Sequence, residues 1–167
     1  MKAFSTETVS SARAFQISPT DTNYFAILFD EAKDGIENIF VIEIFNRGGA
    51  TPPNEHSHAH EFFYVLHGSG IAICDGKELP IKKGDALLLN PGNEHVVRNT
   101  GDSKLYTLTV MTPNQGFAEL IRAGTPVELQ NLVRDALLVV VTLMSLRLTP
   151  AGVRQDNQFG WGPMLEV

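Results

Sequence analysis

Short apolar segments repeat along the chain from about residue 23 to residue 111. Each is rich in Val, Ile, Leu, Phe and Tyr, and Gly, Pro, Asn or Asp separates it from the next at intervals of about ten residues. The segments are "NYFAILFD", "NIFVIEIF", "EFFYVLHG", "GIAICDG", "ELPIKKG", "ALLLN", "HVVRN" and "KLYTLTVM". Short strands of regular spacing are typical of an antiparallel sandwich or barrel, so the sequence predicts an all-β fold of about eight strands.

Two turns are specified by their residue types. Asp75-Gly76 separates two apolar segments, and these residues suit a two-residue hairpin turn, which needs positive φ at both central positions. The strands on either side of it are therefore predicted to pair directly. Pro91-Gly92 suits the central positions of a type II turn, which would place His95 early in the next strand.

The pattern outside the strands divides the chain into three parts. Residues 1–22 are rich in Ser and Thr without sustained periodicity, and we expect a loose arm or an edge strand. Residues 23–111 form the predicted barrel, and residues 112–167 a helical extension and tail. In the extension, "GFAELIRAG" has helical spacing and ends on glycine, which predicts a short helix. A second helix is expected over residues 126–146, although its latter half is β-branched enough for a strand.

Composition and charge narrow the partners and the location. The formal net charge is −6 and the pI about 5.3, so no strong positive field attracts nucleic acid or an anionic membrane, and neither is expected as a partner. The longest apolar run, residues 136–146, is much shorter than the roughly 20 residues that cross a bilayer. The single cysteine, Cys74, cannot form an intramolecular disulfide, and no leader pattern begins the chain, so we expect a cytoplasmic location.

Histidines gather in one segment of a chain that is otherwise poor in them. Four of the five, namely His56, His58, His60 and His67, lie between residues 56 and 67. Residues two apart share a strand face, and imidazole together with the carboxylate of Glu61 is the ligand mix that Fe, Mn, Ni, Zn or Cu favours. Because Glu61 has the opposite parity, a bulge or short loop is expected in "SHAH". His95 is a further candidate, since an unpartnered imidazole in a buried strand would be costly.

The spacing of these residues resembles the two sequence motifs of the cupins. The first motif, G-x5-H-x-H-x3-4-E-x6-G, matches Gly48, His56, Glu61 and Gly68, with Asn54 in place of the first histidine. The second motif, G-x5-P-x-G-x2-H-x3-N, matches Gly84, Gly92, His95 and Asn99, with Asn90 in place of the proline. The two motifs occur in order, and the strand pattern extends the likeness to residues 23–111.

The resemblance implies a double-stranded β-helix, a small jelly-roll barrel that is often dimeric and holds one divalent metal ion (Fe, Mn, Ni, Zn or Cu). The ligands carried over are His56, Glu61 and His95. For the fourth we expect His58, because imidazole is the better ligand, with Asn54 or His60 as substitutes. If Asn54 holds that place, the set has two histidines and one carboxylate and leaves more open positions, as in non-haem iron enzymes. A barrel that has lost its metal is a further alternative.

Several apolar and aromatic residues near the motifs are candidates for contact with a substrate. Phe63, Val65 and Leu89 are expected to pack the barrel, with substrate contact secondary. Tyr64 and Tyr106 could offer a hydroxyl group to a ligand, although tyrosines of the core or of an interface are more common.

The site favours a metal-dependent, dioxygenase-like enzyme that acts on a small organic molecule, because four side-chain ligands leave two positions for substrate and O2. The segment "VMTPNQGFAELIRAGTP" is similar to the helical extension of quercetinase-like bacterial cupins. One alternative is a non-catalytic cupin that binds or senses a small molecule. Another is a sugar-phosphate isomerase or epimerase, but the basic residues near the motifs resemble surface positions. A homodimer is expected, since the apolar C-terminal segment and aromatic tail would be buried against a second copy.

Overall fold

Ten strands and two short helices make up residues 3–129, the part of the chain that the computed structural model describes. In chain order they are β1 (Arg13–Gln16), β2 (Asn23–Phe29), α1 (Glu31–Asp34), β3 (Ile39–Phe45), β4 (His60–His67), β5 (Ser69–Cys74), β6 (Lys77–Lys82), β7 (Ala86–Leu89), β8 (His95–Asn99), β9 (Leu105–Thr112), α2 (Phe117–Ala123) and β10 (Thr125–Val127).

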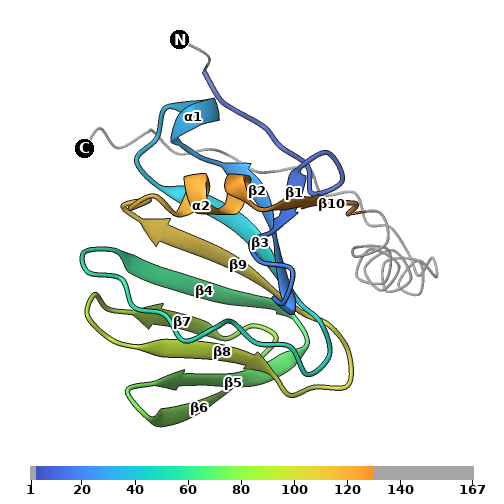
Figure 1. Cartoon of the computed structure of the whole chain (residues 1–167), viewed down its shortest axis with the longest axis vertical. Coiled ribbons are helices and arrows are strands. Elements are labelled where there is room, and N and C mark those ends of the chain that lie inside the picture. The colour runs from blue at the N-terminus through green and yellow to red at the C-terminus, as the bar shows by residue number, and fades with distance from the viewer. Residues whose placement is uncertain (1–2, 130–167) are drawn as a thin grey trace, which may run out of the picture. The chain divides into compact units, whose positions relative to one another are not determined.

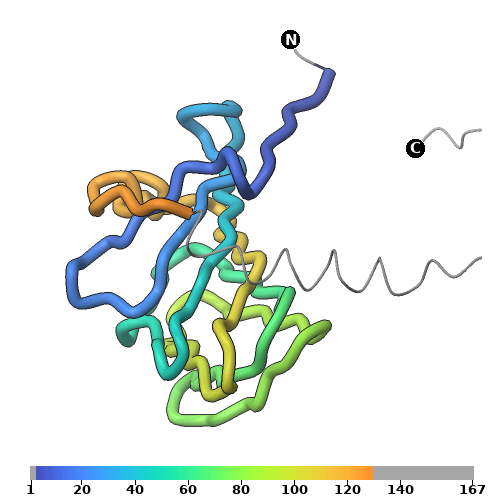
Figure 2. The backbone as a smooth tube through the Cα atoms, turned by 90° about the vertical axis from the view of Figure 1, so that its right-hand side faces the viewer, coloured from blue at the N-terminus to red at the C-terminus, as the bar shows by residue number. Residues whose placement is uncertain are grey.

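The strands form two antiparallel sheets that pack face to face (Figure 1). The larger sheet has seven strands in the order β10-β1-β2-β3-β9-β4-β7, and the smaller has three in the order β6-β5-β8. Figure 2, turned by a quarter, shows the green segments of the smaller sheet at one end, with α2 and the N-terminal strands at the other. This is the predicted all-β jelly-roll barrel, a double-stranded β-helix with a short helix after it.

The eight strands predicted from the apolar pattern are all present, as β2 to β9. Asp75 and Gly76 have φ of 47° and 75°, as a two-residue hairpin turn requires, and the flanking Cys74 and Lys77 pair directly. Gly92 has φ of 78°, which fits its place in the turn before β8.

The ends of the described chain extend the larger sheet. β1, which lies within the predicted N-terminal arm, pairs with both β2 and β10. The second helix was predicted to begin at residue 126, but Thr125–Val127 form β10 instead. Thr and Val favour strands, and Pro126 is tolerated there because β10 is the edge of the sheet. The rest of that helix, the tail and the dimer surface expected from them lie outside the described residues.

The predicted short helix is α2, and the glycine after it has a different role from the one expected. Gly124 has an extended backbone (φ −74°, ψ −174°) rather than the left-handed C-cap conformation. A Cβ atom there would lie 2.3 Å from the carbonyl oxygen of Gln16. Glycine is required because the chain after α2 passes directly against the end of β1.

Among residues 3–129, the core shows two hydrophobic clusters with polar residues between them. One cluster is Phe15, Phe25, Ile27, Ile39, Val41, Ala59, Met111, Ala118 and Ile121. The other is Phe45, Phe63, Val65, Ala72, Ile81, Leu89, Val97 and Leu105. On β3, Val41 and Phe45 belong to different clusters, and the buried Glu43 lies on the same inward face between them. The barrel interior therefore contains a polar band, in which the candidate site lies.

Candidate metal centre

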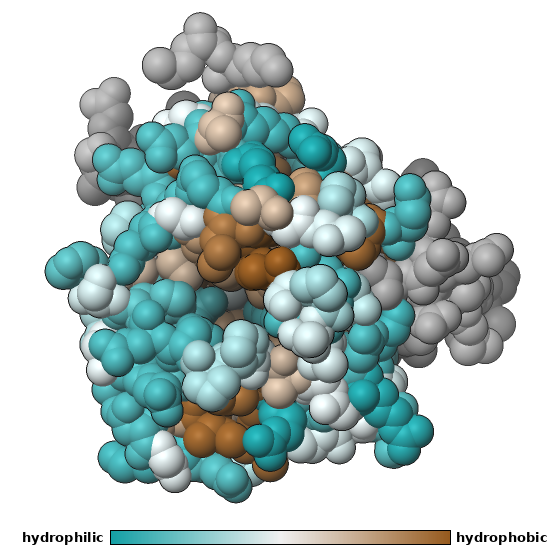
Figure 3. Space-filling model, viewed as in Figure 1, coloured by the Kyte–Doolittle hydropathy of each residue, from teal (hydrophilic) through white to brown (hydrophobic). Residues whose placement is uncertain are grey.

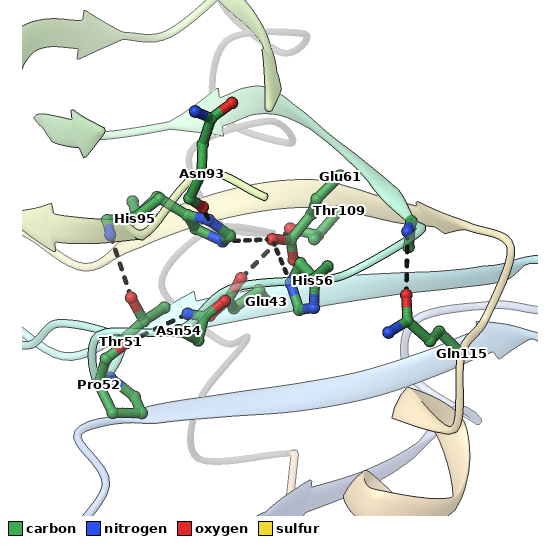
Figure 4. Close-up of polar contacts among 12 residues, drawn as sticks. Glu43, Thr51, Pro52, Asn54, His56, Glu61, Asn93, His95, Thr109 and Gln115 are labelled. Carbon is green, nitrogen blue, oxygen red and sulfur yellow. Dashed lines mark hydrogen bonds and ion pairs between the residues drawn. The ribbon is translucent and has the colours of Figure 1, made fainter. Parts of the chain in front are cut away.

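The three best candidates for metal ligands come from three segments of the barrel (Figure 4). Glu61 is the second residue of β4 in the larger sheet, and His95 is the first residue of β8 in the smaller sheet. His56 lies in the connection that leads into β4. The chain bends at Ser57 and His58, which is the predicted interruption that lets His56 and Glu61 face the same point.

The side chains of these residues converge on one carboxylate oxygen. Glu61 Oε2 lies 2.8 Å from His95 Nε2 and 3.2 Å from His56 Nε2. One ligand atom from each of the three residues lies within 4.8 Å of the others. Glu61 and His95 are buried, with exposed fractions of 5% and 3%, while His56 is partly exposed toward the cavity. His56 is thus the least buried of the three candidate ligands.

A backbone hydrogen bond decides which nitrogen of His95 faces the cluster. Its Nδ1 lies 3.0 Å from the backbone carbonyl oxygen of Asn93, and a carbonyl can only accept, so Nδ1 carries the proton. Nε2 faces Glu61 Oε2 at 2.8 Å, and a cation bound there would displace the proton of this hydrogen bond and take the lone pair of Nε2. A second hydrogen bond of this kind commonly fixes the tautomer of a metal-binding histidine.

Electrostatics within the cluster hold the carboxylate ionised. Burial raises the pKa of Glu61, but hydrogen bonds from His56 and His95 outweigh that effect, so its pKa lies below the usual value. For His95, burial lowers the pKa, while the hydrogen bonds with Glu61 and with the Asn93 carbonyl raise it more, so the net pKa is raised. A divalent cation would replace the proton on His95 as the partner of Glu61.

The donor set fits a first-row divalent ion. Two imidazole nitrogens and one carboxylate oxygen suit Fe, Mn, Ni, Zn or Cu, whereas Mg and Ca prefer oxygen ligands alone. The observation that supports this fit is the shared approach of both Nε2 atoms to a buried carboxylate, with the tautomer of His95 fixed by Asn93.

The structure does not bring the expected fourth ligand, His58, into this cluster. His58 is exposed, and its backbone N–H donates to Gln115 Oε1. His60, the first residue of β4, is also exposed and has the opposite parity from Glu61. Asn54 lies closer to the site: its backbone pairs with that of His95, and its side chain lines the same cavity as His56. Asn54 is therefore the substitute that the geometry favours.

A side chain from beyond β9 holds the bend between His56 and Glu61. Gln115 Oε1 accepts hydrogen bonds from the backbone N–H groups of His58 (3.1 Å) and Ala59 (2.9 Å), and its Nε2 donates to Ser57 Oγ (2.7 Å). Figure 4 shows Gln115 on the outer side of this bend. Gln115 therefore holds the backbone of the bend at which His58 is exposed.

The candidate substrate contacts fall on both faces of the larger sheet. Phe63 lines the cavity beside the site. Val65 and Leu89 are core residues of the second hydrophobic cluster, as expected of packing residues. Tyr64 is exposed on the outer face, and Tyr106 is buried on that face against the ring of His67. The two tyrosines therefore do not point into the barrel.

A cavity of about 230 Å³ opens beside the candidate ligands. Apolar side chains, including Phe25, Phe117 and Leu120, form one part of its wall, and on the face in Figure 3 hydrophobic residues gather around a recess. His56, Glu61, Asn54, Asn23 and Glu43 supply polar groups. No Lys or Arg is among the described residues that line it.

Sequence reasoning missed Glu43, a second buried carboxylate in this cavity. Its Oε1 accepts from Asn23 Nδ2 at 2.7 Å and its Oε2 from the hydroxyl of Thr109 at 3.3 Å. Burial, and then repulsion from Glu61, raise the pKa of Glu43 to about 8. The available signal was a single charged residue within the apolar run "IFVIEIF", at an inward parity.

Comparisons with known proteins place the chain in a family. The family model Cupin_2, cupin domain, matches residues 41–111. A protein of Thermotoga maritima named oxalate-binding protein is 31% identical over 85 residues, which cover 51% of this chain and 70% of that protein. The chain belongs to the cupins, and His56, Glu61 and His95 form a possible metal-binding site in its barrel.

Solved structures agree on the fold. A predicted oxalate decarboxylase from Thermotoga maritima gives a TM-score of 0.57 at 26% identity and covers 62% of this chain and 95% of that chain. A sugar phosphate isomerase of the cupin superfamily from Silicibacter pomeroyi gives a TM-score of 0.55 at 19% identity, covering 62% of this chain and 73% of that chain. The second likeness concerns the fold alone.

A second family model, putative citrate transport, matches residues 105–167. This match covers less than half of the chain, and most of it lies beyond residue 129. Within residues 3–129, no helix is long and apolar enough to span a membrane.

Proposed function

We propose that this cupin binds a first-row divalent metal through His56, Glu61 and His95 and uses it to act on a small organic acid in a dioxygenase-like reaction. The observation that carries the proposal is the convergence of two imidazole nitrogens and a buried carboxylate at the wall of a cavity of about 230 Å³. A cavity of this size favours a ligand of a few carbon atoms.

The number of side-chain ligands supports the reaction type. Three protein ligands leave three positions of a six-coordinate ion for a chelating acid, a water molecule or O2. When bound, the metal would supply Lewis-acid and redox chemistry. His56 and His95 would hold the ion against Glu61. Asn54 lines the same cavity, and its amide oxygen is our candidate for a fourth contact.

The charge of the cavity wall supports an acidic ligand whose binding requires the metal ion. Among the described residues, the wall has Glu43, Glu61 and Asp21 but no Lys or Arg, so a carboxylate ligand would find its positive partner only in a bound cation. The name of the oxalate-binding relative supports a small carboxylate. The same wall disfavours the sugar-phosphate isomerase, whose substrate needs cationic residues around its phosphate.

A second candidate is binding without turnover, which the name of the same relative favours. Calorimetry should show oxalate binding to the protein loaded with Mn²⁺ and none to the protein treated with chelator. An oxygen electrode then separates the candidates: uptake that depends on metal and acid supports the enzyme, and binding without uptake supports the binding protein. Equal oxalate affinity with and without metal would refute both.

A further inference from the structure

The wall of the cavity contains a polar group that the candidate metal centre does not use. Asn23 on β2 and Glu43 on β3 are each 1% exposed and are joined by the hydrogen bond from Asn23 Nδ2 to Glu43 Oε1. The hydroxyl of Thr109 on β9 donates to the other oxygen, Glu43 Oε2. The hydroxyl oxygens of Thr107 and Thr109 lie 2.9 Å apart. Figure 4 shows Glu43 and Thr109 beside the ligand cluster. Three neighbouring strands thus fix Glu43 in one orientation.

This group has acceptor capacity that is not used. Asn23 Oδ1 is buried and accepts no hydrogen bond from the residues that the structure describes. Each Glu43 oxygen receives one hydrogen bond and has room for another. Buried polar atoms without partners are rare in folded proteins, because leaving such an atom unpaired is costly. A ligand that brings a donor into this part of the cavity would satisfy them.

We propose that Asn23 and Glu43 form a second subsite, which takes a hydroxyl group of the acid bound at the metal. The ligand class is then a short carboxylic acid with a hydroxyl group at the end away from its carboxylate. This inference rests on the proposed function, because the carboxylate is assigned to the metal.

A hydroxyl group fits this subsite better than a second anionic group. It can donate to Asn23 Oδ1 or to Glu43, and it can also accept, so it pairs with Glu43 whether or not that carboxyl carries a proton. A terminal carboxylate or phosphate would instead face acidic residues without a cationic partner among the described lining residues.

Three acids of equal length test the subsite. Propionate, 3-hydroxypropionate and malonate end in a methyl, a hydroxyl and a carboxylate group, respectively. Their affinities would be measured by calorimetry on the full chain loaded with Mn²⁺, for the wild type, Glu43→Leu and Glu43→Gln. Metal content and a thermal melt are measured on each sample. Asn23→Leu provides a second variant if Glu43→Leu does not fold.

We expect 3-hydroxypropionate to bind the wild type about tenfold more tightly than propionate, because one buried hydrogen bond typically changes an affinity by about that factor. Glu43→Leu should remove this advantage, whereas Glu43→Gln, which keeps a donor and an acceptor, should retain it. The affinity for propionate should change less than twofold in either variant. The affinity for malonate should not fall, because neither variant leaves an acidic group at position 43 for its second carboxylate to face.

Two results would overturn the inference in different ways. If propionate and malonate bind but 3-hydroxypropionate gains nothing over propionate, or all three acids weaken equally in Glu43→Leu, the subsite is wrong and the proposed function stands. If none of the acids binds the metal-loaded wild type, the proposed function fails, and the subsite fails with it.

Discussion

Glu43→Gln should stabilise the metal-free protein, and the gain should grow with pH. The carboxyl of Glu43 has a pKa of about 8 in the folded chain, because of burial and the nearby Glu61, against 4.5 in the unfolded chain. A group whose pKa is raised on folding contributes stability below the unfolded value and loses it as pH rises through the folded value. Glutamine is a neutral isostere that can keep the contacts with Asn23 and Thr109, so it avoids this loss.

The magnitude follows from the two pKa values. At about 1.36 kcal/mol for each unit, the shift from 4.5 to about 8 corresponds to roughly 5 kcal/mol between pH 4 and pH 9. For a chain of this length, that difference is on the order of 10 °C in melting temperature.

Thermal melts in the presence of a chelator at pH 4, 6 and 8.5 would measure the effect. Glu94→Gln, at an exposed position, is the control and should show no such trend. A constant difference between Glu43→Gln and wild type at all three pH values would contradict the assignment of Glu43 as a buried acid. So would a variant that is less stable than wild type at pH 8.5.

Three further predictions concern positioning, packing and pH. Gln115→Ala should weaken metal affinity about tenfold in a chelator competition, because the bend beside His56 loses three hydrogen bonds. The melting temperature of the metal-free protein should change little, and an unchanged metal affinity would refute this role of Gln115. Gly124→Ala should destabilise the fold by about 1–3 kcal/mol in urea titrations, since its Cβ would meet the carbonyl of Gln16, and a neutral effect would contradict the close approach. Metal affinity should fall as pH decreases through the raised pKa of His95, because protons compete for Nε2; calorimetry from pH 8 to pH 5.5 would show it, and a flat profile would exclude His95 as a ligand.

The strands could be predicted because their signals are local. Apolar runs and turn residues such as Asp75-Gly76 act within a few positions, and the structure has a strand at each predicted run. β10 could not be predicted in the same way. Its three residues have no periodicity of their own, and their hydrogen bonds come from β1, more than a hundred positions earlier in the chain.

Only part of the candidate site could be predicted from the sequence. The spacing of His56, Glu61 and His95 was sufficient to nominate them, and the structure brings the three together. The exposed position of His58 could not be foreseen, because the bend that carries it is held by Gln115, which is 57 positions away. Glu43 carried a local signal, a single charge at an inward position of an apolar strand, and its partner Asn23 is 20 positions earlier.

The metal content of the purified protein tests the central claim most directly. Plasma mass spectrometry would be applied to protein prepared without affinity tag or added metal, for the wild type, His95→Ala and the matched control His60→Ala. We predict close to one equivalent of a first-row metal in the wild type and in His60→Ala, and its loss in a folded His95→Ala. A wild type that contains no metal and takes up none of Fe, Mn, Ni, Zn or Cu on reconstitution would contradict the metal centre and the function proposed for it.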